Sequence, residues 1–140
     1  MLLDSNILIY AANQSAPETE ALVTSADNAV ASVTEIEVYG FTGLKPQEKA
    51  ALDTLFSRLT VHALDKAVVQ RAIALRQGSK MGLADAIIAA TALVHHLPLV
   101  TRNANDFKHV TELKLIDPFT TETRDLNVGQ GDQQGGNARN

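Results

Sequence analysis

Short apolar segments alternate with longer segments of helical periodicity along nearly the whole chain. The short segments cover residues 1–3, 29–33, 60–62, 97–101 and 113–116. Parallel strands cannot be joined by a tight turn, so each needs a crossover, which is usually a helix. Strands and helices in strict alternation are therefore typical of a parallel sheet with helices on both of its faces. The sequence predicts an α/β fold of this kind.

The intervening segments differ in how much of their surface is apolar. Helices are expected after Asp4 and over residues 17–26, from 32 or 34 to about 40–43, and over 46–58, 65–78 and 83–94. The segment 83–94 is apolar on almost every side, which predicts a central helix between the sheet and another layer. For the helix over 65–78 we expect a buried stripe formed by Val68, Val69, Ala72, Ile73 and Leu75.

Length and composition favour one domain followed by a tail. The 140 residues are 45% apolar, which suffices for one hydrophobic core but hardly for two independent ones. Residues 121–140 hold four of the eight glycines and few apolar side chains. Such a segment cannot offset the entropy of ordering its backbone. We therefore expect a domain over residues 1–120 and a disordered tail over 121–140.

Charge and cysteine content exclude several classes of protein. A net charge of −4 gives no overall positive field for coating nucleic acid. The absence of cysteine excludes a disulfide framework, a thiolate zinc site and a cysteine nucleophile. Asp4 interrupts the apolar start, which disfavours a signal peptide, and no apolar stretch reaches about 20 residues. These features lead us to expect a cytoplasmic protein without membrane segments.

Acidic residues follow the predicted strands at the points where each strand ends. Asp4 follows the first strand, Glu35 and Glu37 follow the second, and Asp106 follows the segment 97–101. Asp85 begins the predicted central helix. Because the carboxyl ends of parallel strands form one edge of a sheet, these carboxylates should lie in one cleft. Such oxygen-rich clusters suit Mg²⁺ or Mn²⁺, and metal-assisted phosphodiester hydrolysis is the natural chemistry.

Each acid taken alone has a simpler structural interpretation. Asp4 could only cap the first helix, and Asp85 could only complement a helix dipole. Two overlapping capping boxes are present, because Glu35 follows Ser32, and Glu37 follows Thr34, by three residues. Asp106 could be an ordinary loop acid. None of these roles explains why the acids accumulate at one edge, and this common position carries the hypothesis.

Four segments together resemble the PIN-domain ribonucleases, in particular the VapC-like toxins of bacterial toxin-antitoxin pairs. The segments are 2–10, 32–40, 83–93 and 99–107, and the resemblance extends through nearly all of residues 1–118. It implies a catalytic group of Asp4, Glu37, Asp85 and Asp106, supported by Ser5, Asn6, Thr101 and Asn103. Many members of the family have aspartate where this chain has Asn103, so a second metal position is in doubt.

The resemblance also implies a mechanism and partners. Asp4, Asp85 and Asp106 would hold Mg²⁺ or Mn²⁺, which would activate a water against an RNA phosphodiester, and Glu37 would ligate or orient through water. Lys80, Arg102 and Lys108 would add contacts at the cleft rim. An antitoxin protein would restrain the toxin by placing a basic side chain in the acidic cleft. A homodimer is also implied, with candidate interface residues Ile9, Tyr10, Val38, Tyr39 and Phe41, for which the domain's own core is the favoured alternative.

Two other functions remain open. A catalytically silent PIN-like module that binds RNA or a partner is conceivable because Asn103 replaces an acid. A phosphatase of the haloacid-dehalogenase type is less favoured, because that family needs a second aspartate where this chain has Asn6. The sequence does not indicate which RNA is cut, because recognition of unpaired bases depends on the shape of the rim.

Overall fold

A five-stranded parallel sheet forms the centre of the molecule. The computed structural model describes residues 1–13, 19–25 and 27–119. The strands are β1 (Leu2–Leu3), β2 (Ala29–Ala31), β3 (Thr60–His62), β4 (Leu99–Val100) and β5 (Leu115–Ile116), in the order β3-β2-β1-β4-β5. All four strand pairings are parallel. With β1 in the middle, the residue after β1 lies at the centre of the carboxyl edge.

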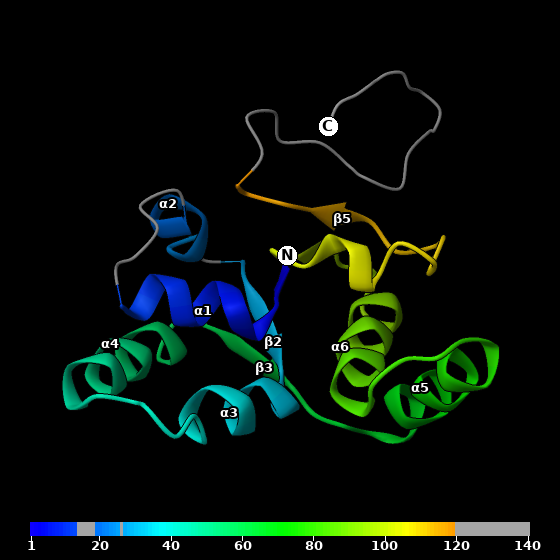
Figure 1. The fold of residues 1–140 in the computed structure, drawn as a ribbon, viewed down its shortest axis with the longest axis horizontal. Helices are drawn as coiled ribbons and strands as arrows, with labels where there is room; N and C mark the ends of the chain where they lie inside the picture. Colours follow the sequence, from blue (N-terminus) through cyan, green and yellow to red (C-terminus); the bar gives the residue numbers. More distant parts are fainter. Residues whose placement is uncertain (14–18, 26, 120–140) are drawn as a thin grey trace.

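Helices cover both faces of this sheet (Figure 1). They are α1 (Ser5–Ala12), α2 (Glu20–Val23), α3 (Ser32–Tyr39), α4 (Pro46–Phe56), α5 (Lys66–Gly78) and α6 (Leu83–Val94), with a short 3₁₀ helix η2 (Ala104–Asp106). Alternate strand residues enter two separate apolar clusters: Leu2 and Leu99 pack with α6, whereas Leu3 and Val100 pack with α1. This alternation is the period-two geometry of a strand. The predicted α/β class with helices on both faces is confirmed.

The central position predicted for the segment 83–94 is also confirmed. Every residue of α6 from 86 to 92 is buried. Helix α6 packs against α5 on its outer side and against the sheet on its inner side. A helix enclosed in this way needs apolar side chains on all its faces. Its first turn, which carries Asp85, is less enclosed, since Leu83 is exposed and Asp85 is partly buried.

The predicted buried stripe of α5 is wrong at two positions. Val68 and Ala72 are buried and Leu75 is partly buried, but the exposed fractions of Val69 and Ile73 are 38% and 52%. Residues 68, 72 and 75 follow the spacing of a single helix face, while 69 and 73 lie about 100° further round the helix. Helix α6 covers only the first of these faces, because α5 is the outermost layer on its side of the sheet.

One predicted dimer residue belongs to the domain's own core. Val38 is fully buried, so it cannot lie on an exposed interface. Ile9 and Tyr39 are partly buried against the same apolar cluster. Of the five candidate residues, only Phe41 is a strongly exposed apolar side chain, with 51% of its surface accessible.

Several predicted boundaries shift by a few residues. The strand predicted over 29–33 ends at Ala31, because Ser32 already begins α3. The helix predicted over 17–26 is described only as α2, since residues 14–18 and 26 lie outside the described residues. The predicted tail over 121–140 also lies outside them. Among the described helices, none combines the length and the apolar character that crossing a membrane requires.

Candidate active site

Asp4 lies at the centre of the carboxyl edge and accepts hydrogen bonds from two directions. Its Oδ1 accepts from the Ser5 backbone N–H at 2.7 Å, which makes Asp4 the cap of α1. Its Oδ2 accepts from the Thr101 hydroxyl at 2.7 Å and lies 3.4 Å from Asn6 Nδ2. The capping role considered as an alternative is therefore real, yet it uses only one of the two carboxylate oxygens.

The surroundings of Asp4 disfavour its charged form. Burial raises the pKa of Asp4 to about 6, and the neighbouring carboxylates of Asp85 and Glu37 add to this rise. Hydrogen bonds from Thr101 and Ser5 act in the opposite direction. A carboxyl group in this condition gains more from a bound cation than an isolated surface acid does, because the cation removes the repulsion.

Glu37 is directed toward Asp4 by α3 and by Ser5. The Ser5 hydroxyl donates to Glu37 Oε1, and it lies 3.4 Å from the hydroxyl of the buried Thr34. Helix α3 begins at Ser32, its N-cap is Ala31, and no side chain caps it. Both predicted capping boxes are therefore wrong, because Ser32 and Thr34 already lie inside the helix. Glu37 therefore does not cap α3, and its carboxylate accepts from the hydroxyl of Ser5, the first residue of α1.

Asp85 and Asp106 complete the group from the other side. Asp85 lies in the first turn of α6 and is partly buried. Burial raises the pKa of Asp85, and the charges of Asp106 and Glu37 raise it further. Asp106 ends η2 and is exposed. The structure thus brings Asp85 near both Asp106 and Glu37.

Residues that follow β4 orient the Asp4 carboxylate through hydrogen bonds. The Thr101 hydroxyl accepts from the Asn103 backbone N–H at 3.0 Å, which directs its own proton to Asp4. Asn6 Oδ1 accepts from the Arg102 backbone N–H at 3.3 Å. The contact that Asn103 makes here is through its backbone, a role that the sequence alone did not indicate.

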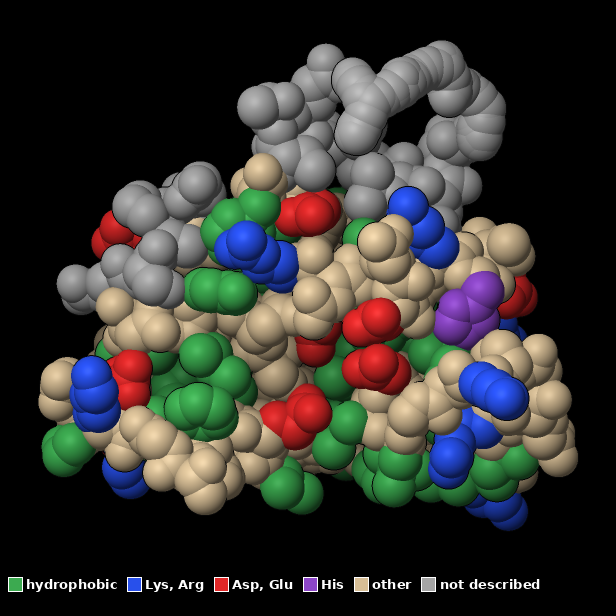
Figure 2. Space-filling view, in the orientation of Figure 1, with side chains coloured by type: hydrophobic (Ala, Val, Ile, Leu, Met, Phe, Trp, Pro, Cys, Tyr) green, Lys and Arg blue, Asp and Glu red, His purple; other side chains and the backbone are tan. Residues whose placement is uncertain are grey.

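Electrostatic influence links Asp4, Glu37 and Asp85 to one another and Asp106 to Asp85, whereas Glu35 is not part of this group. The charges of Asp85 and Glu37 raise the pKa of Asp4, and the charges of Asp106 and Glu37 raise the pKa of Asp85, so Asp106 is linked to the other acids through Asp85. Glu35 is exposed and acts on Tyr39 instead. Figure 2 shows acidic side chains near the middle of one face, with basic side chains on both sides of them.

The carboxylate oxygens of the four acids are chemically suited to bind a hard divalent cation. Carboxylate oxygens are the ligands that Mg²⁺ and Mn²⁺ prefer, and the repulsion among these carboxylates is what a cation would relieve. As placed, no three acidic or histidine side chains within residues 1–13, 19–25 and 27–119 form a ready-made metal-binding group. Ligation by Asp4, Asp85 and Asp106 therefore requires their side chains to move closer together.

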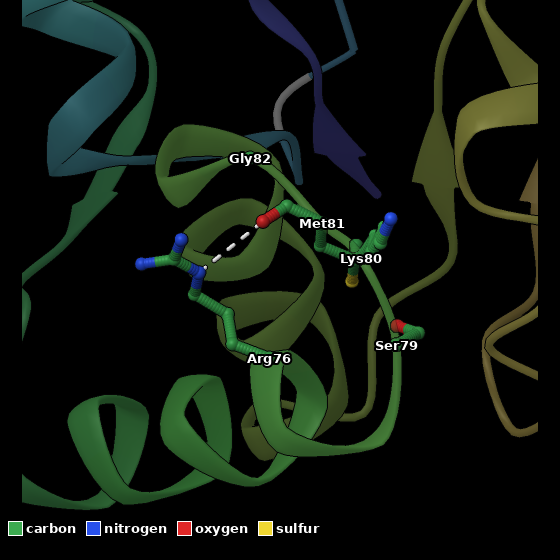
Figure 3. A pocket seen from close by; sticks show the side chains of 5 residues that line it. All are labelled: Arg76, Ser79, Lys80, Met81 and Gly82. Atoms are coloured by element: carbon green, nitrogen blue, oxygen red, sulfur yellow. Dashed lines mark hydrogen bonds between the residues drawn. The ribbon is translucent and has the colours of Figure 1, made fainter.

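A hollow between α5 and α6 contains one of the predicted rim cations, Lys80 (Figure 3). Arg76 Nε donates to the Met81 carbonyl at 3.2 Å, which ties the connecting loop to α5. The Arg76 guanidinium and the Lys80 amine point to opposite sides of the hollow. Two cations that diverge in this way do not form one anion site, and the contact of Arg76 stabilises the loop that precedes Asp85.

Two functional features escaped the sequence reasoning. Thr34 appeared only as a capping residue, although it is buried beside Ser5. Tyr10 and Phe119 contact the guanidinium of Arg102, and these residues are far apart in sequence. The single available signal was the position of Arg102 directly after the strand that ends at the site.

The family model for the PIN domain matches residues 1–113. The chain belongs to the PIN domain family. A comparison with curated proteins gave no match. This PIN domain is similar to a chain in the structure of a toxin-antitoxin complex from Klebsiella pneumoniae, with 32% identity and a TM-score of 0.71 over 84% of this chain and 97% of that one.

Two further solved structures resemble this PIN domain. One is VapBC2 from Rickettsia felis bound to a DNA fragment from its promoter, at 28% identity and a TM-score of 0.69, covering 81% of this chain and 95% of that one. The other is VapBC-1 from nontypeable Haemophilus influenzae, at 24% identity and a TM-score of 0.68, covering 85% and 98%. At 24% identity, the likeness to VapBC-1 supports the fold alone.

Proposed function

We propose that this PIN domain is a metal-dependent endoribonuclease and the toxin of a toxin-antitoxin pair. The observation that carries the proposal is the group of four carboxylates at the carboxyl edge of the sheet, in which burial and mutual repulsion raise the pKa of Asp4 and Asp85. Repulsion among these carboxylates does not stabilise the fold, so stability does not explain the group. A site that binds a divalent cation and a phosphodiester explains it.

In this proposal Asp4, Asp85 and Asp106 hold Mg²⁺ or Mn²⁺. The bound ion supplies Lewis acidity, which lowers the pKa of a water and neutralises charge on the phosphate. Thr101 and the Ser5 N–H hold the Asp4 carboxylate in a fixed orientation and favour its ionised form. Asp85 lies in the first turn of α6, directly before the buried part of that helix. The hydrogen bonds from Thr101 and Ser5 restrict the motion of the Asp4 carboxylate.

Glu37 has a different position from the other three acids. It accepts from the Ser5 hydroxyl and lies close enough to influence both Asp4 and Asp85. We assign it the orientation of water next to the phosphate rather than direct ligation. Ser5 then acts as a positioning residue that fixes the Glu37 carboxylate.

The toxin assignment rests on the solved structures that resemble the chain. One of them is a toxin-antitoxin complex, and its matching chain is 32% identical to this chain. We propose a cognate antitoxin that brings a basic side chain, best an arginine, to the four carboxylates. A guanidinium there would satisfy the carboxylates and exclude RNA at the same time. The proposal also includes a homodimer and a cytoplasmic location.

Product analysis tests the proposed reaction. The purified chain is incubated with a folded RNA and with the corresponding DNA, each with Mn²⁺ and with EDTA. We expect RNA fragments with defined ends, formed only with the metal. An RNA that stays intact with every divalent ion would contradict the proposal and favour a silent RNA- or partner-binding module. Fragments that form equally in EDTA would point to another chemistry.

Expression in a bacterial host tests the toxin assignment. The chain alone should arrest growth, and Asp85→Asn should not. Co-expression of a cognate antitoxin should restore growth and yield a complex. If the wild-type chain is harmless and binds no small protein, the toxin assignment fails even where RNA cleavage is found.

A further inference from the structure

Arg102 is held by two aromatic rings that come from separate parts of the chain. Its guanidinium carbon lies 4.2 Å from the centre of the Phe119 ring and 5.0 Å from that of Tyr10. The two rings meet edge to face, with their centres 5.4 Å apart. Tyr10 belongs to α1, and Phe119 follows β5. An exposed arginine normally samples many rotamers, and this contact restricts it to few.

The same arginine is tied to Asp4 through one side chain. Asn6 accepts from the Arg102 backbone N–H at 3.3 Å through Oδ1, and its Nδ2 lies 3.4 Å from Asp4 Oδ2. The preceding residue, Thr101, donates to the same oxygen of Asp4. The start of the Arg102 side chain is therefore fixed relative to the carboxylate group, and the rings fix its end.

The charge of Arg102 remains available to a ligand. Within the described part of the chain, the ion pairs join Lys49 to Asp53 and Arg71 to Glu112, and Arg102 takes part in neither. A ring on the face of a guanidinium leaves the N–H groups along its edge unused. Those N–H groups form a planar fork that matches two oxygens of a phosphate.

We propose that Arg102 is a positioning residue that binds a backbone phosphate of the RNA next to the one that is cut. This inference rests on the proposed function. The carboxylates and the net charge of −4 repel an RNA strand, so a fixed cation whose backbone is tied to Asp4 through Asn6 would help to align the strand. A free, mobile lysine would attract the strand without fixing its register.

Equilibrium binding tests this role without requiring cleavage. The affinity of a labelled RNA is measured by fluorescence anisotropy over a range of salt concentrations, in an Asp85→Asn background. Adding Arg102→Ala should weaken binding about 10-fold and reduce the salt slope by about one, as expected for one lost phosphate contact. Phe119→Leu keeps the charge but removes a ring, so it should weaken binding by a smaller factor.

Arg58→Ala is the matched control, because it removes the same charge at the opposite edge of the sheet. Arg58 lies shortly before β3, whereas the carboxylates follow the strands. Arg58→Ala should change neither the affinity nor the slope. Equal effects of Arg58→Ala and Arg102→Ala would show a general charge effect and would overturn the proposal.

Turnover separates positioning from chemistry. In the otherwise native chain, Arg102→Ala should raise KM about 10-fold and leave kcat within about twofold. If Arg102→Ala binds RNA like the parent but loses a co-purifying protein partner, the cation serves that partner and the RNA role is overturned. If binding depends on Arg102 while not even the wild-type chain cuts RNA, the phosphate contact of Arg102 stands, but its place next to a cut phosphate and the nuclease proposal both fail.

Discussion

The Thr101 hydroxyl donates a 2.7 Å hydrogen bond to Asp4 Oδ2, joining residues 97 positions apart. Both side chains are buried, and each directly follows a strand of the parallel pair β1 and β4. The bond therefore depends on the register of that pair. It also opposes the burial that disfavours the Asp4 carboxylate, so the structure of the sheet affects the chemistry of the site.

Thr101→Val tests this relationship. Valine keeps the shape of threonine but removes the hydroxyl that lowers the pKa of Asp4. We expect the acid limb of the rate profile against pH to move to higher pH, with a stability loss of about 1–2 kcal/mol. Thr91→Val removes another buried hydroxyl, bonded to the Ile87 carbonyl, and should leave the limb in place. An unchanged limb in Thr101→Val would refute the proposed role.

The pKa of Asp4 predicts how stability depends on pH without metal. The folded state raises this pKa from 3.8 to about 6, so the folded state binds the proton more tightly than the unfolded state. Asp4 therefore favours folding most at low pH, and this contribution is lost as the pH rises through about 6. The difference corresponds to about 3 kcal/mol at most.

Asp4→Asn removes this titration and keeps most of the shape. In urea unfolding with EDTA at pH 8, we expect the variant to be more stable than the wild type by about 1–2 kcal/mol, after some loss of hydrogen bonding. At pH 4.5 the advantage should shrink or reverse. A wild type that gains stability relative to Asp4→Asn between pH 4.5 and pH 8 would show that the sign is wrong.

Glu37 and Glu35 lie two residues apart on α3 but face different surroundings. Both are exposed, but Glu37 accepts from the Ser5 hydroxyl and influences Asp4, whereas Glu35 influences Tyr39. Glu37→Gln should slow RNA cleavage about 10-fold or more, whereas Glu35→Gln should leave it within about twofold. Ser5→Ala should have an effect between the two. A larger loss of cleavage rate in Glu35→Gln than in Glu37→Gln would contradict this assignment and place the site on the Glu35 side of α3.

Removal of residues 121–140 tests the domain boundary expected from composition. The segment has few apolar side chains, so it should contribute little buried surface. We expect the chain of residues 1–120 to melt within about 2 °C of the full chain and to cut RNA at a similar rate. The Tm is measured by calorimetry. A large drop in Tm on removal of residues 121–140 would mean that the tail packs against the domain.

The sequence was sufficient to predict the fold class because its apolar pattern changes period where the structure changes element. Leu2 and Leu3 enter opposite clusters, and α6 is apolar on all sides because both of its faces are covered. The pattern failed at Val69 and Ile73, where apolar side chains remain exposed on the outer helix α5. Periodicity identifies a helix face, but only the packing partner decides how wide a face is buried.

The candidate site was predictable as a set of acids but not as a set of contacts. The position after each strand predicts Asp4, Glu37 and Asp106 at one edge, and in the structure Asp106 is linked to the other two acids through Asp85. The choice between Glu37 and Glu35 depends on where α3 begins, which a pattern places only within two residues. The stack of Arg102 on Phe119 joins residues that no local spacing relates, so only the folded chain reveals it.

The metal dependence of cleavage by the wild type and by Asp85→Asn tests the central claim most directly. Rates are measured on one RNA across a Mn²⁺ titration and in EDTA, with Glu35→Gln as the matched control. We expect no cleavage in EDTA, saturable activation of the wild type and of Glu35→Gln, and a rate at least about 100-fold lower in Asp85→Asn. Full activity in EDTA, or an Asp85→Asn variant as active as the wild type, would contradict the claim.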